Sequence, residues 1–327
     1  MLSGEKILIT GAAGLGPFPI AAGLAKNNEV WGLARFSDPA ARRKVEAAGI
    51  RPFAADLGSG DFEGLPADFT YLLHFAWLRA ELPQLEEALR VNVEGAGLIL
   101  QHCRKAKAAL VVSGMGVYST HTDPMHVYTE ADPIGRGVTP YAATSPASKV
   151  GVEAVARFCA RAFNLPITIA RLNTVFGVSD NMSGNYHAKL VASAMDGSPF
   201  RVPGDPNPHS TIHTDDMQAQ IEPLLGAAGV PALITNWCGD EVITTQHAAA
   251  ELERIAGKRV TLEVVDIPGA PKGNAADPTR RRSITGPCQV RFTDGLERLY
   301  RELSARPDLI GQIPPNARGA ALRPASA

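Results

Sequence analysis

Short apolar runs alternate with longer amphipathic stretches through the first half of the chain. The apolar runs predict strands at 6–10, 29–34, 50–54, 70–75, 109–113 and 166–171. Between them, apolar residues spaced three and four apart predict helices at about 18–27, 39–48, 83–106 and 146–163. Strands and helices that alternate in this way form a parallel sheet covered on both faces. The predicted fold class is therefore α/β, with a doubly wound parallel sheet.

In such a sheet, ligands bind beyond the carboxyl ends of the strands. The sequence therefore predicts functional residues in the segments that directly follow strands. These segments are 11–16, 34–36, 56–57, 75–79, 113–118 and 171–177.

The first predicted strand ends in a glycine-rich turn, and helical spacing resumes after Pro17. Glycines at such a turn let the backbone approach a pyrophosphate, and the helix N-terminus supplies N–H donors. The residues predicted to contact a dinucleotide cofactor here are Gly11, Ala13, Gly14, Leu15 and Gly16. The pattern calls for a third glycine at position 17, but proline is tolerated at a first helical position. An ordinary glycine-rich turn is the alternative interpretation.

The second predicted strand ends with Arg35, where an acidic residue would bind the ribose hydroxyls of NAD. An arginine at this place accommodates the 2′-phosphate of NADP. The sequence therefore predicts NADP in preference to NAD. Arg42 and Arg43 follow closely and are interpreted equally well as solvated surface charges.

Composition narrows the class of protein. The 327 residues are 45% hydrophobic and 20% charged with a net charge of −1, which gives no basic face for nucleic acid. No apolar run reaches the roughly 18 residues that span a bilayer, so no membrane contact is expected. Four dispersed cysteines and a strand that starts within six residues favour a reduced, cytoplasmic protein without a signal peptide. The five histidines His121, His126, His187, His209 and His213 lack metal-ligand spacing.

Several motifs follow one another along residues 5–302. They are Thr10-Gly-Ala-Ala-Gly14, Ala55-Asp56-Leu57, His74-Phe-Ala76, Val91-Asn92-Val93-Glu-Gly95, Val112-Ser113 through Val117-Tyr118, Arg171-Leu-Asn-Thr-Val-Phe-Gly177, Ile212-His-Thr-Asp-Asp216 and Asn236-Trp-Cys-Gly239. In these motifs and their order the chain resembles the extended short-chain dehydrogenase/reductases, the family of nucleotide-sugar epimerases and dehydratases.

The resemblance implies a domain organisation and a set of cofactor contacts. Residues 1–175 would form a Rossmann-type NAD(P)-binding domain and 176–304 a smaller substrate lobe whose chain partly returns to that domain. Residues 305–327 are expected to be a flexible tail. Asp56 and Leu57 would hold the adenine, Phe75 and Ala76 would line the cofactor, and Asn92 would brace the site.

Members of this family use a tyrosine four residues before a lysine, plus a serine or threonine, to move the substrate's hydroxyl proton. Lys149 holds the lysine position, and it would also bind the cofactor's ribose. Ser145 occupies the tyrosine position, and Tyr141 is eight residues upstream. If Ser145 caps the helix that Pro146 begins, Tyr141 lies in the preceding loop and can fold back toward Lys149. The family's serine or threonine corresponds to Gly114, with Ser113 one place early.

The substrate positions also depart from the family. His209 replaces the arginine that grips a substrate phosphate, and Thr174 replaces an asparagine beside the diphosphate. Neither side chain offers the fork of donors that suits phosphate. The sequence therefore predicts a small or aromatic substrate instead of a nucleotide sugar.

Three functions remain open at this stage. The first is an NADP(H)-dependent oxidoreductase or epimerase that acts on a carbonyl or alcohol carbon through an atypical proton relay. The second is an enone reductase or lyase on the same fold. The third is a regulatory protein that binds NADP(H) without turnover. The expected partner is a small-molecule substrate, and a homodimer is compatible with the sequence.

Overall fold

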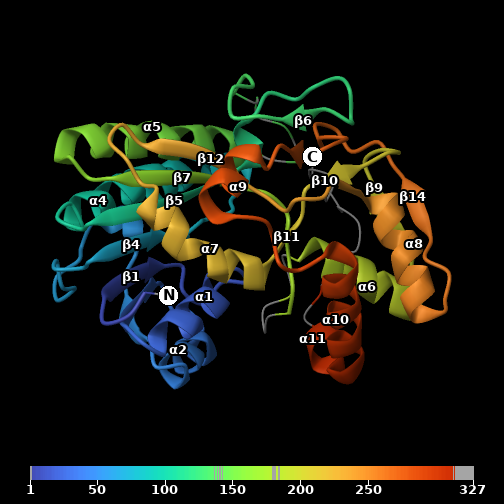
Figure 1. The fold of residues 1–327 in the computed structure, drawn as a ribbon, viewed down its shortest axis with the longest axis horizontal. Helices are drawn as coiled ribbons and strands as arrows, with labels where there is room; N and C mark the ends of the chain where they lie inside the picture. The colour runs from blue at the N-terminus through green and yellow to red at the C-terminus, as the bar shows by residue number, and fades with distance from the viewer. Residues whose placement is uncertain are drawn as a thin grey trace.

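A seven-stranded parallel sheet forms the larger part of the molecule (Figure 1). The computed structural model describes residues 2–135, 137, 139, 141, 143–178, 182, 185–311 and 313. The strand order is β12-β7-β5-β4-β1-β2-β3. The strands are β1 (Lys6–Thr10), β2 (Glu29–Ala34), β3 (Arg51–Ala54), β4 (Tyr71–His74), β5 (Ala108–Gly114), β7 (Ile167–Leu172) and β12 (Leu233–Trp237). The doubly wound α/β fold predicted from the alternation is confirmed.

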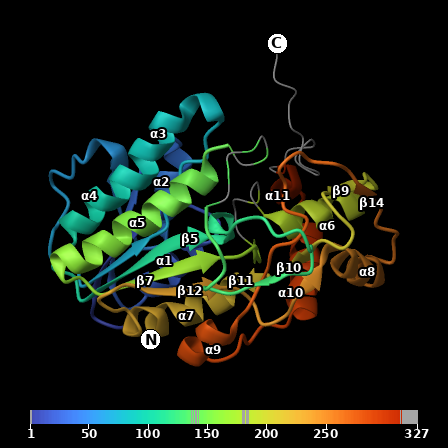
Figure 2. The ribbon, with the colours of Figure 1, turned by 90° about the horizontal axis from the view of Figure 1, so that it is seen from above.

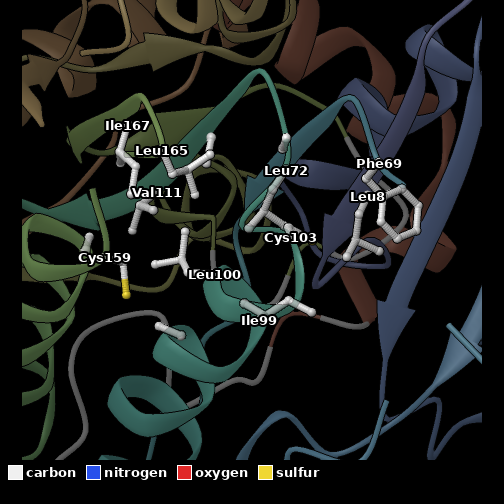
Figure 3. Packing of buried hydrophobic residues seen from close by; sticks show 14 of the residues in the cluster. Leu8, Phe69, Leu72, Ile99, Leu100, Cys103, Val111, Cys159, Leu165 and Ile167 are labelled. Atoms are coloured by element: carbon white, nitrogen blue, oxygen red, sulfur yellow. The ribbon is translucent and has the colours of Figure 1, made fainter. Parts of the chain in front are cut away.

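Helices cover both faces of this sheet (Figure 2). On one face lie α3 (Leu85–Leu89), α4 (Gly95–His102) and α5 (Ser145–Phe163), and on the other lie α1 (Pro17–Ala25), α2 (Pro39–Ala47) and α7 (Thr214–Gly226). Successive strand side chains point to opposite faces. Leu8 accordingly packs with Ile99 and Leu100 of α4 (Figure 3), whereas its neighbours Ile7 and Ile9 pack against α1 and α7.

The long helix predicted at 83–106 is broken into four pieces. A 3-10 turn at Leu82–Gln84 leads into α3, a π-helical turn follows at Arg90–Glu94, and α4 completes the segment. Apolar spacing alone does not distinguish the wider winding of a π turn from an α-helix, so the sequence pattern did not reveal the break. Such turns occur often at functional sites.

A second, smaller lobe follows the sheet. It contains α6 (Tyr186–Asp196), α8 (Thr245–Ala256) and α10 (Phe292–Ala305), which share an apolar core. Short strands pair around it: β9 (Phe200–Val202) with β14 (Leu262–Val264), β10 (Pro208–His209) with β13 (Ile243–Thr244), β11 (Ile212–His213) with β8 (Val175–Phe176), and β15 (Ala275–Ala276) with β6 (Val127–Tyr128). Between these pieces the chain returns to the sheet as α7 and β12, and α9 (Thr279–Thr285) packs against both. Within the described residues, no helix is both long and apolar enough to cross a membrane.

The folded chain extends beyond the boundary predicted at residue 305. Residues Pro307–Gly311 form α11, and Leu309 and Ile313 are fully buried in the core of the second lobe. The expected flexible tail is therefore wrong for this segment, because its two apolar side chains complete the packing against α10. The rest of that tail, residues 314–327, lies outside the described residues.

Candidate active site

The strand order reverses between β1 and β4, and this is where a ligand binds in a doubly wound sheet. Thr10, the last residue of β1, joins the two strand ends. Its hydroxyl oxygen accepts hydrogen bonds from the backbone N–H of Phe75 (3.1 Å) and Ala76 (3.0 Å) and lies 2.9 Å from Nδ1 of His74. Two accepted bonds use both oxygen lone pairs, so the Thr10 hydroxyl donates to Nδ1 and the His74 proton resides on Nε2.

The glycine-rich turn after β1 has the shape that a dinucleotide requires. Gly11 has a φ of +72°, and a Cβ there would lie 3.0 Å from the Ala76 Cα. Gly14 N–H donates to Gly11 O at 2.9 Å, and Pro17 begins α1, as the sequence predicted. Among the described residues, the N–H groups of Ala13, Leu15 and Gly16 have no hydrogen-bond partner. These free donors at a helix N-terminus fit a pyrophosphate, so the predicted cradle is chemically suited to the cofactor.

The adenine side of the predicted site is organised around Asp56. Asp56 Oδ1 accepts from Gly58 N at 3.0 Å, and its Oδ2 pairs with Arg90 at 3.0 Å, while Leu57 is buried beneath. Burial by itself raises the pKa of Asp56, but the Gly58 bond and the charges of Arg90 and Arg35 together hold it below its usual value. Arg35 is exposed just beyond β2 and close enough to act on Asp56. An anion beside Arg35 would therefore meet an available guanidinium.

Asn92 fixes the loop that follows β4. Its amide oxygen accepts from Leu78 N at 2.7 Å, and its amide nitrogen donates to Leu78 O at 2.9 Å. Asn92 is buried in the π-helical turn, and Phe75 at the start of the loop packs against Trp237 of β12. The loop 75–80 is thus held against two elements.

Lys149 lies at the carboxyl end of β5. Its Nζ donates to Val112 O at 3.1 Å and lies 3.7 Å from the centre of the Trp77 ring, a cation–π contact. Burial lowers the pKa of Lys149 to about 7, against the opposing influence of the Glu153 carboxylate. Burial and the nearby Lys149 charge lower the pKa of His74 to about 3, so that imidazole is neutral. Lys149 is therefore an amine that can gain or lose a proton near neutral pH.

The two residues at the end of β5 point in different directions. A Cβ on Gly114 would lie 3.8 Å from Cε of Lys149, so position 114 faces the lysine. Ser113 is instead 2% exposed, and its hydroxyl donates to Oε1 of Glu153 at 2.7 Å. Glu153 in turn forms a buried two-bond ion pair with Arg171, at 2.9 and 2.8 Å. The expectation that Ser113 supports the proton relay is corrected: its side chain points to the Glu153–Arg171 pair because strand neighbours alternate in direction.

Ser145 and Tyr141 also differ from their expected roles. The residue that precedes α5 in the N-cap position is Thr144, whose hydroxyl donates to Ala80 O at 2.9 Å, and Ser145 is the first residue of the helix. Ser145 is therefore not the cap. It stands one helical turn before Lys149, on the same face. Tyr141 is 46% exposed. Its predicted neighbours Pro140 and Ala142 lie outside the described residues.

A network of neutral polar groups surrounds His209 and Thr174, the two positions for which the resemblance implied phosphate ligands. His209 Nδ1 lies 3.1 Å from the Thr174 hydroxyl, and its Nε2 lies 3.0 Å from Oδ1 of Asn207. The Tyr186 hydroxyl joins the same Asn207 oxygen at 3.2 Å and the Thr245 hydroxyl at 2.8 Å. Burial lowers the pKa of His209 to about 4, so the ring carries no charge near neutral pH. Both of its nitrogens are engaged by protein groups.

A cavity of about 300 Å³ lies between the first turn of α1 and residues of α7 and α10. It is lined in part by Phe18, His213, Asp215 and Arg298, and Arg298 pairs with Asp215 at 3.0 Å. None of the residues predicted from the sequence as site residues lines it. The cavity is therefore separate from the chemistry around Lys149.

The sequence did not identify Trp77 or Glu153 as residues of the candidate site. Trp77 follows Phe75 and Ala76 at a strand end that was predicted to carry function, so its position was a usable signal. The contact with Lys149 was not visible, because it joins segments 72 residues apart. The pairing of Glu153 with Ser113 and Arg171 likewise depends on the register of β5 against β7.

Comparisons with known proteins agree with this geometry. Residues 7–220 match the model of the NAD dependent epimerase/dehydratase family. The fold is similar to that of the UDP-glucuronic acid 4-epimerase from Bacillus cereus in complex with UDP-glucuronic acid and NAD, with 22% identity, coverage of 94% of this chain and 99% of that one, and a TM-score of 0.77. A search of curated protein sequences gave no match.

Two further solved structures have similar folds. The UDP-glucose 4-epimerase of Thermus thermophilus in complex with NAD shares 19% identity, with coverage of 92% and 99% and a TM-score of 0.76. The UDP-N-acetylglucosamine 4-epimerase of Methanobrevibacter ruminantium, in complex with UDP-N-acetylmuramic acid, shares 16%, with coverage of 93% and 100% and a TM-score of 0.80. The family match extends over more than half of the chain and includes the glycine turn, the Asn92 brace and Lys149. The chain therefore belongs to the NAD-dependent epimerase/dehydratase family of enzymes.

Proposed function

We propose that this enzyme oxidises or reduces an alcohol or carbonyl carbon of a small substrate, and that the Lys149 amine itself accepts and returns the substrate's hydroxyl proton. The observation that carries the proposal is the placement of the Lys149 amine. It lies at the carboxyl end of β5, bonded to Val112 O, and faces a position at Gly114 that has no side chain. A bound pyridine nucleotide supplies hydride acceptance or donation at such a carbon.

The proposed proton relay uses the space at positions 114 and 145 that the family's larger side chains would otherwise fill. With glycine at 114 and serine at 145, a substrate oxygen can approach the Lys149 amine directly. The neutral amine then accepts the hydroxyl proton during oxidation, and the ammonium returns it during reduction. Ser145, one turn away on α5, can donate a hydrogen bond to the same oxygen. Trp77 covers the other side of the amine and limits its contact with water.

The proposed cofactor is NADP(H). Arg35 is exposed at the end of β2 and stands where an acidic residue would select NAD. Its guanidinium, close to Asp56, is available for the 2′-phosphate. Two of the similar structures described above contain NAD, so the preference proposed here is a property of this chain's own residues.

The proposed substrate is a small or aromatic molecule without a nucleoside diphosphate. Support comes from the subsite around His209, which holds no charge near neutral pH and whose hydrogen-bonding groups already satisfy one another. A diphosphate brought there would lose water without gaining a cation. The similar epimerase from Bacillus cereus binds UDP-glucuronic acid, and that ligand is not assigned to this chain.

A screen of turnover tests this proposal. The enzyme with NADP⁺ or NADPH is offered small and aromatic alcohols, ketones and enones, and in parallel UDP- and dTDP-sugars, with nicotinamide absorbance as readout. We expect turnover in the first group. Exclusive turnover of a nucleotide sugar would overturn the substrate assignment. Reduction of enones alone would favour the alternative of C=C reduction. Absence of turnover in every group, despite cofactor binding, would favour a regulatory protein.

A further inference from the structure

A buried ion pair lies one helical turn from the Lys149 amine and has no part in the proposed proton relay. Glu153 follows Lys149 by four residues on α5, so the two side chains leave the same face of the helix. Glu153 is 2% exposed, and its partner Arg171 is 3% exposed. Burying two charges costs hydration that their attraction often does not fully return, so stability by itself does not explain the pair.

The amine and the ion pair are attached to neighbouring residues of β5. Lys149 Nζ donates to Val112 O at 3.1 Å, and the hydroxyl of Ser113, the next residue, donates to Glu153 Oε1 at 2.7 Å. Helix α5 packs against β5 and β7, and Arg171 belongs to β7 (Figure 2). Because Val112 and Ser113 are adjacent, these two bonds fix where the amine and the carboxylate lie relative to each other.

The Glu153 carboxylate has little freedom to move. Its Oε1 accepts from Ser113 and from Arg171 Nε at 2.9 Å, and its Oε2 accepts from Arg171 Nη2 at 2.8 Å. The guanidinium lies over the Tyr118 ring, 4.8 Å from the ring centre, and the Tyr118 hydroxyl donates to Asn236 Oδ1 at 2.6 Å. A charge fixed in this way needs no reorganisation when the charge of a neighbouring group changes.

The protonated form of Lys149 depends on a nearby anion. Burial disfavours an ammonium and can lower the pKa of a lysine by several units. Here burial lowers the pKa of Lys149 to about 7, and the Glu153 carboxylate opposes that decrease. His74 on β4 adds no charge, because burial and the charge of Lys149 lower its pKa to about 3. The counter-charge for a protonated Lys149 therefore comes from Glu153.

We propose that Glu153 is a positioning residue of the reaction, which acts through Lys149 by stabilising the ammonium form from one helical turn away. The inference rests on the proposed function, because it adds a second residue to proton transfer by Lys149. An amine that accepts a proton during oxidation must also hold it for return during reduction. Ser113 and Arg171 act one step further away, because they hold the carboxylate.

An NMR titration of Lys149 tests the proposal without a substrate. The protein is isotopically labelled at the lysine Cε carbons, and the Lys149 signal is identified by its absence in Lys149→Met. The test variant combines Glu153→Gln with Arg171→Met, because replacing Glu153 alone would leave a buried guanidinium unpaired. We expect the titration midpoint of Lys149 to fall by about one pH unit or more, as when an opposite charge a few ångströms away is removed.

A second variant and a control separate charge from structure. Arg171→Met alone should raise the midpoint, because the Glu153 carboxylate then lacks its guanidinium. The matched control combines Glu297→Gln with Arg301→Gln, which removes an exposed ion pair of α10 and should leave the midpoint unchanged. Cofactor affinity equal to that of the parent shows that each variant is folded. An unchanged midpoint in both Arg171 variants, or an equal shift in the control, would overturn the proposal.

Failure of this inference and failure of the proposed function give different results. The midpoint is read without turnover, so it can fall as expected even if no compound in the substrate screen reacts. With a substrate in hand, the acidic limb of the pH profile of kcat for oxidation should move to lower pH in the double variant, because the neutral amine then persists to lower pH. Turnover with an unmoved limb would keep the proposed function and overturn the role of Glu153.

Discussion

The cofactor side and the substrate side of the candidate active site differ in how closely they follow the sequence pattern of the family. On the cofactor side, Thr10, Gly11, Asp56 and Asn92 belong to the motifs that carry the resemblance, and each makes a contact that shapes the predicted binding surface. On the substrate side, the resemblance implies other residues at the positions of the catalytic tyrosine, the catalytic hydroxyl and two phosphate ligands, which here are Ser145, Gly114, His209 and Thr174. Lys149 lies at the boundary and is the residue retained among those that move protons.

This difference follows from what each half binds. A dinucleotide has a fixed shape, and its pyrophosphate requires backbone N–H groups that only a tight glycine turn can present. Substrate recognition instead depends on a few side chains on loops and on the second lobe, which can change without disturbing the sheet. Under the proposed function, the cofactor side keeps the family's pattern and the substrate side serves a different substrate.

The largest effect is expected from Lys149, where the two halves meet. Lys149→Met keeps the apolar stem beside Trp77 and removes the amine. We expect turnover to fall by about 10²- to 10⁴-fold, the usual contribution of a general acid or base. Steady-state kinetics with the substrate found in the screen measure this. Full activity of the variant would assign proton transfer to another group.

The cofactor half is tested by Gly11→Ala. The new Cβ would lie 3.0 Å from backbone of Ala76 in a residue with a φ of +72°. We expect cofactor affinity to fall by about five- to 100-fold, because overpacking of a tight contact costs about 1–3 kcal/mol. Gly4→Ala is the matched control, since Gly4 has the same φ and open space around it. Equal loss in both variants would show that backbone strain, and not the close approach, is responsible.

Cofactor choice depends on Arg35. The enzyme should bind NADPH about tenfold to 100-fold more tightly than NADH, which is the range for hydrogen bonds to a charged group. Arg35→Asp should reduce or invert that ratio, whereas Arg161→Asp, an exposed change on α5, should leave it alone. Fluorescence titrations with both nucleotides give the ratio. Equal affinities in the unmodified enzyme would contradict the NADP assignment.

The neutral state of the substrate half predicts a sensitivity to acid. Burial lowers the pKa of His209 to about 4, below its unfolded value, so the unfolded chain binds more protons as pH falls from 7 to 5. The free energy of unfolding should therefore drop over this window, by up to about 2 kcal/mol from this histidine. His209→Gln should flatten the slope in urea titrations at pH 7, 6 and 5. Parallel curves for the two proteins would contradict a neutral buried ring.

The smallest effect separates Ser145 from Tyr141. Ser145→Ala should lower turnover by about three- to tenfold, as for one lost hydrogen bond to the substrate oxygen. Tyr141→Phe should change turnover less, because the Tyr141 side chain is about half exposed to solvent. Rates of the two variants under saturating cofactor decide the matter. A loss of about 100-fold in Tyr141→Phe would restore the loop tyrosine as the proton donor.

Several features of the fold and the site could be predicted because they depend on residues close together in the sequence. The alternation of apolar runs predicted β1, β2, β3, β4, β5 and β7 of the main sheet to within a residue or two, and the glycine turn predicted where α1 begins. The resemblance pointed to position 114, which lies beside Lys149, and helix periodicity places Ser145 one turn before Lys149.

Contacts between segments far apart in the chain could not be predicted from the sequence. Nothing local shows that Trp77 covers Lys149, that Ser113 is committed to Glu153, or that Leu309 completes a core. These depend on strand register and on how the second lobe packs against the sheet, where a shift of one residue reverses the direction of a side chain. The sequence by itself determined the elements and the cofactor turn, because these follow from local periodicity and backbone sterics. Tertiary structure alone decided which side chains surround the reacting carbon, because that depends on packing between segments many residues apart.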